Sequence, residues 1–225
     1  MSKRPNPAGG KHRVFIVEDH PIFREGLVRL LEAESDLDVC GEADDYESGL
    51  AGIKKLQPDL VLVDLELPDK SGLDLIKKIR ALKLEVKLLV VSMYDEALYA
   101  NRVLKAGGDG YIMKEESPNE LVHAIHDVLD GRIYVSDEVL SRNSKEPAKP
   151  DARSEHRPLQ DLTDLELRVL ELLGQGMSNM EIAEQLRLKV DDIPGHYSQL
   201  RQKLKQKTDN ALIRYAVCWV EKGVA

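Results

Sequence analysis

The sequence contains few of the residues that define several classes of protein. Its 225 residues include 2 cysteines, and only 4% are aromatic. Cys40 and Cys218 are too few for a disulfide framework or a metal cluster, so we expect two buried thiols. No apolar run reaches the roughly 18 residues that a membrane span needs, and residues 1–12 lack the apolar core of a secretory signal. These absences predict a cytoplasmic protein that does not enter a membrane.

An excess of positive charge is also missing. The chain has 32 Lys and Arg against 40 Asp and Glu, a formal net charge of -8. Residues 1–157 contain 23 basic and 30 acidic residues, whereas residues 158–225 contain 9 and 10. An acidic first part argues against nucleic-acid binding there and permits a cation site. Charge alone leaves the ligand of the second part open.

The first part of the chain alternates apolar runs with amphipathic helical patterns. The apolar runs cover residues 12–17, 37–43, 59–63, 86–92 and 109–113. The run that ends at Asp64 is apolar on both faces, which is typical of a central parallel strand. Five such alternations predict an α/β fold, a doubly wound five-stranded parallel sheet of order 2-1-3-4-5 with helices on both faces.

The pattern changes twice after this sheet. Residues 136–158 are rich in proline and charge and predict a linker. Beyond it every strong pattern is helical, and Thr163 with Glu166 and Ser178 with Glu181 have the spacing of capping boxes. Helices at about 164–173, 179–186, 193–205 and 210–222 predict an all-α four-helix domain with a helix-turn-helix. The expected segments are 11–135, 136–158 and 159–225.

Polar side chains follow four of the five predicted strands. Glu18, Asp19, Asp64, Ser92 and Lys114 would all lie at carboxyl ends of parallel strands, where such sheets bind ligands. Two carboxylates about 4 Å apart repel by roughly 4 kcal/mol at an effective dielectric constant of 20, and one lysine compensates only one of them. We therefore expect a hard divalent cation such as Mg²⁺.

With that cation, Asp64 becomes a nucleophile toward phosphorus, while Ser92 and Lys114 bind phosphoryl oxygens. Taken singly, each residue has a plainer interpretation: a strand-end acid or hydroxyl, a solvated lysine, or for Glu18 and Asp19 an acidic pair at a helix N-terminus. Their joint occurrence at four strand ends favours a phosphoryl-acceptor site.

These residues lie in the stretches EDHPIFREGL, DLELPDKSG, VVSMYDE and GYIMK, through which residues 11–135 resemble the receiver domain of two-component response regulators. The resemblance implies a flavodoxin-like fold and a phosphoryl group passed from a histidine kinase to Asp64. It implies that Mg²⁺ is held by Asp19, Asp64 and the backbone carbonyl of Glu66, helped by Glu18. It also implies that Ser92 and Tyr111 move together on phosphorylation, although Tyr111 could simply be a half-buried packing residue.

The remaining chain, through LTDLELRVLELLGQGMSNMEIAEQL, resembles the DNA-binding domain of NarL/FixJ regulators, which have a LuxR-type helix-turn-helix. The two resemblances together imply a transcription regulator that is not an enzyme and forms a phosphorylation-dependent homodimer. The expected DNA-binding face comprises Tyr197, Ser198, Gln199, Arg201, Lys203 and Lys205. An ordinary exposed helix surface is the alternative interpretation of that face.

The start of the expected recognition helix departs from the family pattern. Pro194 is tolerated in a first turn if Asp192 caps the helix, and Gly195 costs about 1 kcal/mol of helix propensity. These changes leave a second function open, a phosphorylation-switched interaction regulator that no longer reads DNA sequence. A third, an aspartyl-phosphate phosphatase, usually has a second Asp where this chain has Glu66.

Overall fold

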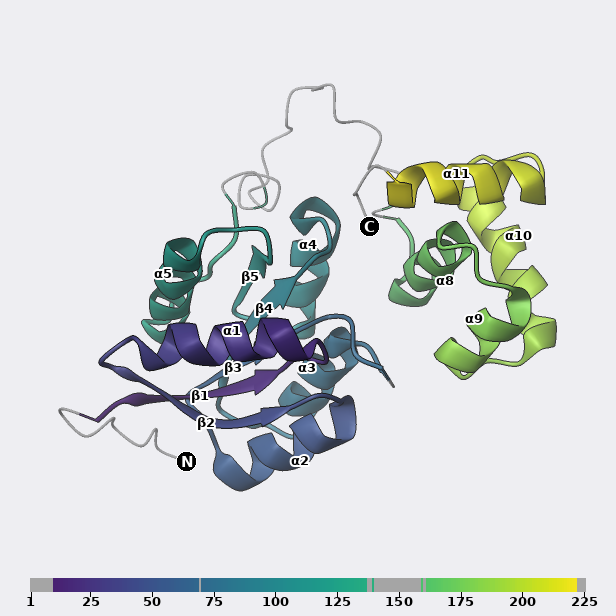
Figure 1. Ribbon diagram of the computed structural model, residues 1–225. Helices are drawn as coiled ribbons and strands as arrows, with labels where there is room; N and C mark the ends of the chain where they lie inside the picture. The colour runs from purple at the N-terminus through teal and green to yellow at the C-terminus, as the bar shows by residue number, and fades with distance from the viewer. Residues whose placement is uncertain (1–9, 69, 137–138, 140–158, 160, 222–225) are drawn as a thin grey trace. The chain divides into compact units, whose positions relative to one another are not determined.

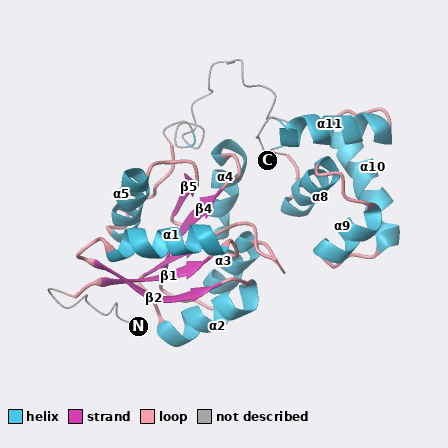
Figure 2. Cartoon of the chain, in the orientation of Figure 1, coloured by secondary structure: helices cyan, strands magenta, loops and turns pink. Residues whose placement is uncertain are grey.

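The computed structural model describes residues 10–68, 70–136, 139, 159 and 161–221, and the chain divides into two compact units, Met1–Leu140 and Ser141–Ala225 (Figures 1 and 2). Most of the expected linker, residues 136–158, lies outside the described residues. The three segment boundaries therefore stay predictions. None of the helices in the described ranges has the length and apolar character that a membrane crossing requires.

The first unit contains one parallel sheet in the predicted order, β2-β1-β3-β4-β5. The strands are β1 (His12–Val17), β2 (Leu37–Ala43), β3 (Leu60–Val63), β4 (Lys87–Ser92) and β5 (Gly110–Met113). All four residues of β3 are buried, and the strand pairs with β1 on one side and β4 on the other. The predicted central position of this strand is confirmed.

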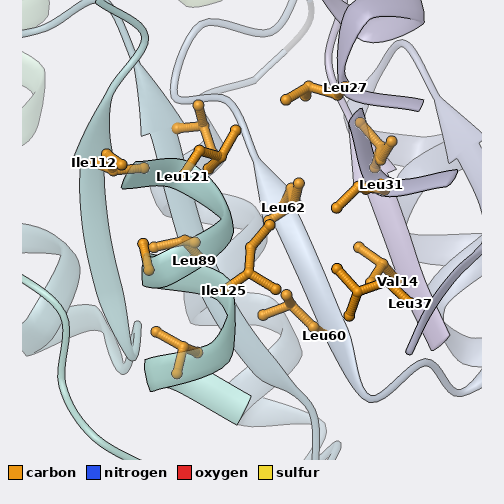
Figure 3. Close-up of a cluster of buried hydrophobic side chains, with 14 residues drawn as sticks. Val14, Leu27, Leu31, Leu37, Leu60, Leu62, Leu89, Ile112, Leu121 and Ile125 are labelled. Atoms are coloured by element: carbon orange, nitrogen blue, oxygen red, sulfur yellow. The ribbon is translucent and has the colours of Figure 1, made fainter. Parts of the chain in front are cut away.

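Among the described residues, five helices cover the two faces of the sheet. They are α1 (Pro21–Glu32), α2 (Tyr46–Leu56), α3 (Gly72–Ala81), α4 (Glu96–Ala106) and α5 (Pro118–Leu129). Leucines of α1 and an apolar stripe of α5 meet alternate strand residues such as Leu60 and Leu62 in one buried cluster (Figure 3). The intervening strand residues point to the opposite face, where α2, α3 and α4 pack. The doubly wound architecture is confirmed.

The second unit is helical throughout its described part. It contains α8 (Asp164–Gly174), α9 (Asn179–Leu186), the 3₁₀ turn η2 (Val190–Asp192), α10 (Ile193–Lys203) and α11 (Asp209–Glu221). Both predicted capping boxes form, with Thr163 and Ser178 at the N-caps and Glu166 and Glu181 closing them. Gly174 lets α8 approach α11, because a Cβ there would lie 2.5 Å from the carbonyl oxygen of Ala216.

Two local expectations were wrong, and one condition was not met. Cys218 is exposed and Cys40 is only half-buried, because α11 turns the first outward and β2 is an edge strand. Asp192 makes no side-chain cap, since it lies in helical conformation where η2 continues directly into α10. Finally, α10 ends at Lys203, and Lys205 beyond it has a left-handed backbone with φ of 55°.

Candidate functional site

Acidic side chains from two neighbouring strands meet at the carboxyl edge of the sheet. Glu18 and Asp19 follow β1 and Asp64 follows β3, and the last residues of these strands, Val17 and Val63, are register partners. Glu18 and Asp64 are buried, with 1% and 3% of their surface exposed, whereas Asp19 is half-buried. One ligand atom from each of these carboxylates, and one from His20, all lie within 4.8 Å of one another.

Lys114 compensates part of this negative charge. It follows β5, and its Nζ lies 2.8 Å from Asp64 Oδ2 and 2.8 Å from Glu18 Oε2. The ammonium group also lies over the ring of Phe23 in α1, 4.6 Å from its centroid. Burial lowers the pKa of Lys114, but the carboxylates of Asp64 and Glu18 outweigh this effect and raise that pKa. The lysine is therefore charged and held between the two buried acids.

Asp64 has the protonation equilibrium of a buried acid. Burial, followed by repulsion from Glu18, raises the pKa of Asp64 to about 7, although Lys114 and the amide of Glu66 act in the opposite direction. The backbone N–H of Glu66 donates to Asp64 Oδ1 at 3.2 Å. A positive charge added beside these acids would favour the ionised form of Asp64.

The acidic cluster has the donor set of a divalent-cation site. Among the described residues, Asp19 Oδ1 is buried without a hydrogen-bond partner, even though His20 Nδ1 lies 2.7 Å away. An unsatisfied buried carboxylate oxygen is costly unless it binds a cation or a donor. Carboxylate oxygens suit Mg²⁺, so Glu18, Asp19 and Asp64 fit the expected ion. Glu66 approaches the cluster through its backbone N–H.

Gly72 brings the start of α3 against the backbone of Asp64. A Cβ built on Gly72 would lie 2.0 Å from the carbonyl oxygen of Asp64, a distance that no side chain tolerates. The N–H of Gly72 donates to the carbonyl of Leu65 at 2.9 Å, which closes the turn after β3. Only a residue without a side chain at position 72 therefore allows α3 to begin this close to the backbone of Asp64.

Ser92 and Tyr111 are connected through the backbone of Tyr94. Tyr111 has 0% of its surface exposed, and its hydroxyl donates to the carbonyl of Tyr94 at 2.6 Å. The N–H of Tyr94 donates to Ser92 Oγ at 3.3 Å. The interpretation of Tyr111 as a half-buried aromatic is wrong, since the side chain is fully buried and hydrogen-bonded. Burial raises the pKa of Tyr111 well above its ordinary value, so the hydroxyl remains a donor.

The expected DNA-binding residues divide into two groups. Ser198, Gln199, Lys203 and Lys205 are exposed, but Lys203 has an ion-pair partner within the unit. Tyr197 is 8% exposed and donates to Asn179 Oδ1 at 2.8 Å.

The other two basic residues have ion-pair partners within the unit. Arg201 Nε lies 3.0 Å from Asp209 Oδ1, and Lys203 Nζ lies 2.6 Å from Glu166 Oε2. These contacts join α10 to α11 and to α8. A DNA contact by either residue would compete with a bond that stabilises the helical unit.

Sequence patterns alone missed four residues of the first site: His20, Phe23, Gly72 and Tyr94. His20 and Phe23 lie in the same stretch as the acid pair, and Gly72 follows Asp64 by eight residues. Proximity in sequence to the acids was the signal that could have indicated them. Tyr94 contributes through its backbone, which side-chain patterns do not reveal.

Comparisons with known proteins match both units. The family model "Response regulator receiver domain" matches residues 14–126, and "Bacterial regulatory proteins, luxR family" matches residues 160–216. The nitrate/nitrite response regulator protein NarL of Escherichia coli is 30% identical over 87% of this chain and 90% of its own length. A putative transcriptional regulator of Pseudomonas aeruginosa is 34% identical over 91% of this chain and 96% of its own length.

A solved structure extends this similarity to the fold. RcsB from Salmonella enterica serovar Typhimurium, bound to the promoter P1flhDC in the presence of the phosphomimetic BeF₃⁻, has a TM-score of 0.70. It is 25% identical, and the match covers 92% of this chain and 98% of that one.

Proposed function

Because this chain belongs to the response regulators with a receiver domain and a luxR-family domain, and is therefore a phosphorylation-dependent regulator of transcription, we propose that Asp64 accepts the phosphoryl group. One observation carries this proposal. Asp64 is a buried carboxylate at the sheet edge, bound to Lys114 and beside Glu18 and Asp19. In this proposal residues 11–135 are the receiver, 159–225 the output domain and 136–158 the linker.

The reaction is a phosphoryl transfer from the phosphohistidine of a histidine kinase. A carboxylate oxygen of Asp64 forms a bond to phosphorus while the P–N bond of the phosphohistidine breaks. The imidazole leaves with the electron pair of that bond, and the product is an acyl phosphate on Asp64. The ionised form of Asp64 is the nucleophile, and the positive charge of Lys114 favours that form.

Mg²⁺ would be held by Asp19, Asp64 and the backbone carbonyl of Glu66, with help from Glu18. When bound, Mg²⁺ would offset the negative charge of the carboxylates and of the phosphoryl oxygens. The unpaired Asp19 Oδ1 supports this assignment, because it lies among the acids and accepts no hydrogen bond from the described residues.

Lys114 and Ser92 bind the phosphoryl oxygens in the product. The phosphoryl group carries about two negative charges, in place of the single charge of the ionised carboxylate, and brings three strong acceptors. Ser92 Oγ then donates to this group and gives up its contact with the N–H of Tyr94. That contact is already long, with 3.3 Å between Tyr94 N and Ser92 Oγ. Because Tyr111 is bonded to the carbonyl of Tyr94, the change at Ser92 is transmitted to Tyr111.

Output requires the helical domain to bind DNA. Exposed Ser198, Gln199 and Lys205 are the direct contacts in this proposal, and Tyr197, Arg201 and Lys203 support them while stabilising the domain. Phosphorylation acts through a homodimer, and the protein works in the cytoplasm with a histidine kinase as its partner. An interaction regulator without DNA readout is not favoured, because the luxR-family model matches the helical domain, and RcsB, which matches 92% of this chain, is bound to a promoter.

Labelling with a small phosphodonor tests the acceptor. Acetyl phosphate with Mg²⁺ should give a retarded band on a phosphate-affinity gel for the wild type and none for Asp64→Asn. Asp74→Asn is the matched control, since Asp74 lies in α3 with 55% of its side chain exposed. Labelling of Asp64→Asn equal to the wild type, with both variants folded by circular dichroism, would contradict the assignment.

The DNA output needs a separate experiment. Selection of bound duplexes from a random-sequence pool, with and without acetyl phosphate, should enrich one family of sequences more strongly in the phosphorylated sample. A pool that stays random in both samples would show that the helical domain does not read sequence.

A further inference from the structure

His20 contributes an imidazole that the proposed phosphoryl transfer does not use. Its Nδ1 lies 2.7 Å from Asp19 Oδ1 and 3.1 Å from Glu18 Oε1. It is the one nitrogen donor in a group whose other members, Glu18, Asp19 and Asp64, offer carboxylate oxygens. The ring is also accessible, because 59% of the side chain is exposed. A group arriving from solvent can therefore reach His20 beside the acidic cluster.

Local backbone structure directs this imidazole to the acids. His20 is the N-cap residue of α1, but its side chain makes no capping hydrogen bond to the helix. Pro21 occupies the first turn and restricts His20 to an extended conformation, with φ of -78° and ψ of 108°. The N–H of His20 donates to Glu18 Oε1 at 3.1 Å, which fixes the residue further. The ring therefore faces the acids before any ion binds.

The spacing of the donor atoms suits ligands of one ion. Two neighbouring ligands on an octahedral ion with bonds of about 2.1 Å lie about 3.0 Å apart. The separations of His20 Nδ1 from Asp19 Oδ1 and Glu18 Oε1, 2.7 and 3.1 Å, bracket that value. Asp19 Oδ1 has no hydrogen-bond partner among the described residues, so one of the two oxygens nearest the imidazole is unsatisfied.

We propose that His20 binds the cation of this site through Nδ1, which makes the site a mixed nitrogen and oxygen centre. Mg²⁺ prefers oxygen ligands, whereas imidazole favours first-row transition ions, whose affinity rises from Mn²⁺ through Co²⁺ to Ni²⁺. The site of this chain consequently selects such ions over Mg²⁺. This inference rests on the cation site of the proposed function and names a further ligand in it.

Mn²⁺ bound to the full-length protein gives a direct test. Electron spin echo spectroscopy detects ¹⁴N coupled to Mn²⁺ when an imidazole is a ligand. The wild type should show this coupling, and His20→Gln should lose it while still binding Mn²⁺. His123→Ala is the matched control, because His123 is an exposed histidine of α5, and it should keep the coupling.

Ion preference gives a second readout. Displacement of Mn²⁺ can be followed from the spectrum of the free ion as Co²⁺ or Mg²⁺ is added. Loss of a ligand should weaken Co²⁺ binding by at least about tenfold in His20→Gln, because loss of a group that only hydrogen-bonds a metal ligand already costs roughly 10–100-fold. Mg²⁺ binding should change by less than about twofold, because an oxygen-preferring ion gains little from the imidazole.

The outcomes separate this inference from the proposed function. Mn²⁺ that binds the wild type and is lost in Asp19→Asn, but shows no ¹⁴N coupling, would overturn the role of His20 and leave the cation site intact. Equal losses of Co²⁺ and Mg²⁺ in His20→Gln would show that His20 only orients the carboxylates by hydrogen bonding, which also overturns it. Failure of Mn²⁺ and Mg²⁺ to bind the wild type would overturn both the inference and the cation site.

Discussion

Lys203 is the last residue of α10 and Lys205 lies two residues beyond it, and their different surroundings predict different effects when each is neutralised. Lys203 Nζ donates to Glu166 Oε2 at 2.6 Å, and this carboxylate also closes the capping box at Thr163. Lys205 is exposed and has no ion-pair partner among the described residues. We predict that Lys203→Met destabilises the helical domain, whereas Lys205→Met weakens DNA binding.

The stability effect can be estimated from the exposure of the two partners. Glu166 is buried, with 4% of its surface exposed, whereas 36% of the Lys203 side chain is exposed. Breaking a fully buried pair costs about 3–5 kcal/mol. The solvated lysine end and the remaining bond from Thr163 reduce this, so we expect Lys203→Met to cost about 1–2 kcal/mol. Lys205→Met should change the free energy of unfolding by less than about 0.5 kcal/mol.

The binding effect follows from counterion release. Each phosphate contact contributes about 0.9 to the slope of log K against log salt concentration. Lys205→Met should therefore reduce that slope by about 0.9, while Lys203→Met should leave it nearly unchanged wherever the domain is folded. A contact of Lys203 with a phosphate would leave the buried carboxylate of Glu166 without its ion-pair partner. The cost of leaving that charge unpaired opposes such a contact.

Both quantities have convenient assays. Trp219 is the only tryptophan of the chain and is buried in α11, so its fluorescence in urea reports on unfolding of the helical domain. Anisotropy of a labelled duplex at several salt concentrations gives the slope. The double variant Glu166→Gln, Lys203→Met should recover part of the lost stability, because no buried charge is left unpaired. A Lys203→Met protein of wild-type stability with a reduced salt slope would refute the argument.

Three further predictions concern single positions. Gly72→Ala should destabilise the first unit by about 1–3 kcal/mol and abolish acetyl phosphate labelling, because the new Cβ meets the carbonyl of Asp64; a labelled, equally stable variant would contradict this. Gly195→Ala should stabilise the helical domain by about 0.5–1 kcal/mol in the Trp219 assay, since nothing lies within 4 Å of the added Cβ; an unchanged or lower stability would show that the site is not open. Burial raises the pKa of Glu166, but bonds from Lys203 and Thr163 outweigh it and hold that pKa below its ordinary 4.5. The stability that Glu166 contributes is thus present above pH 4.5 and lost as pH falls below it. The difference in unfolding free energy between wild type and Glu166→Gln should therefore shrink in acid. A difference that grows in acid would contradict this prediction.

The sheet and its polar edge were predictable because both follow from local patterns. A four-residue apolar run such as β3 needs cover on both faces, and an acid at its end must then lie at the edge of the sheet. Alternation of strands and helices fixes the side of the sheet where Asp64 and Lys114 meet, although they are 50 residues apart. The capping boxes at Thr163 and Ser178 were equally local and formed as predicted.

Features that depend on contacts between distant helices could not be predicted in this way. Lys203 meets Glu166 across 37 residues, and Tyr197 meets Asn179 across 18. Sequence patterns placed Lys203 and Tyr197 on a DNA-binding face, because such patterns do not show which neighbour a side chain contacts. Cys218 was misplaced for the same reason, since the exposed side of α11 depends on how α8 and α10 pack against it.

The charge balance of the acceptor site explains why a phosphoryl group would act as a strong signal there. Lys114 now divides its ammonium group between Asp64 and Glu18, at 2.8 Å from each. Replacing the single charge of the ionised Asp64 carboxylate by the roughly two negative charges of a phosphoryl group draws Lys114 toward the phosphoryl oxygens and weakens its contact with Glu18. The backbone N–H of Lys114 donates to the carbonyl of Ser92 at 2.8 Å, so the lysine and the serine hydroxyl are attached to adjacent strand ends. Ser92 at the end of β4 and Lys114 after β5 are thus both attracted to the phosphoryl group. The backbone of Tyr94, which is bonded to both Ser92 and Tyr111, is the part of this edge that we expect to move.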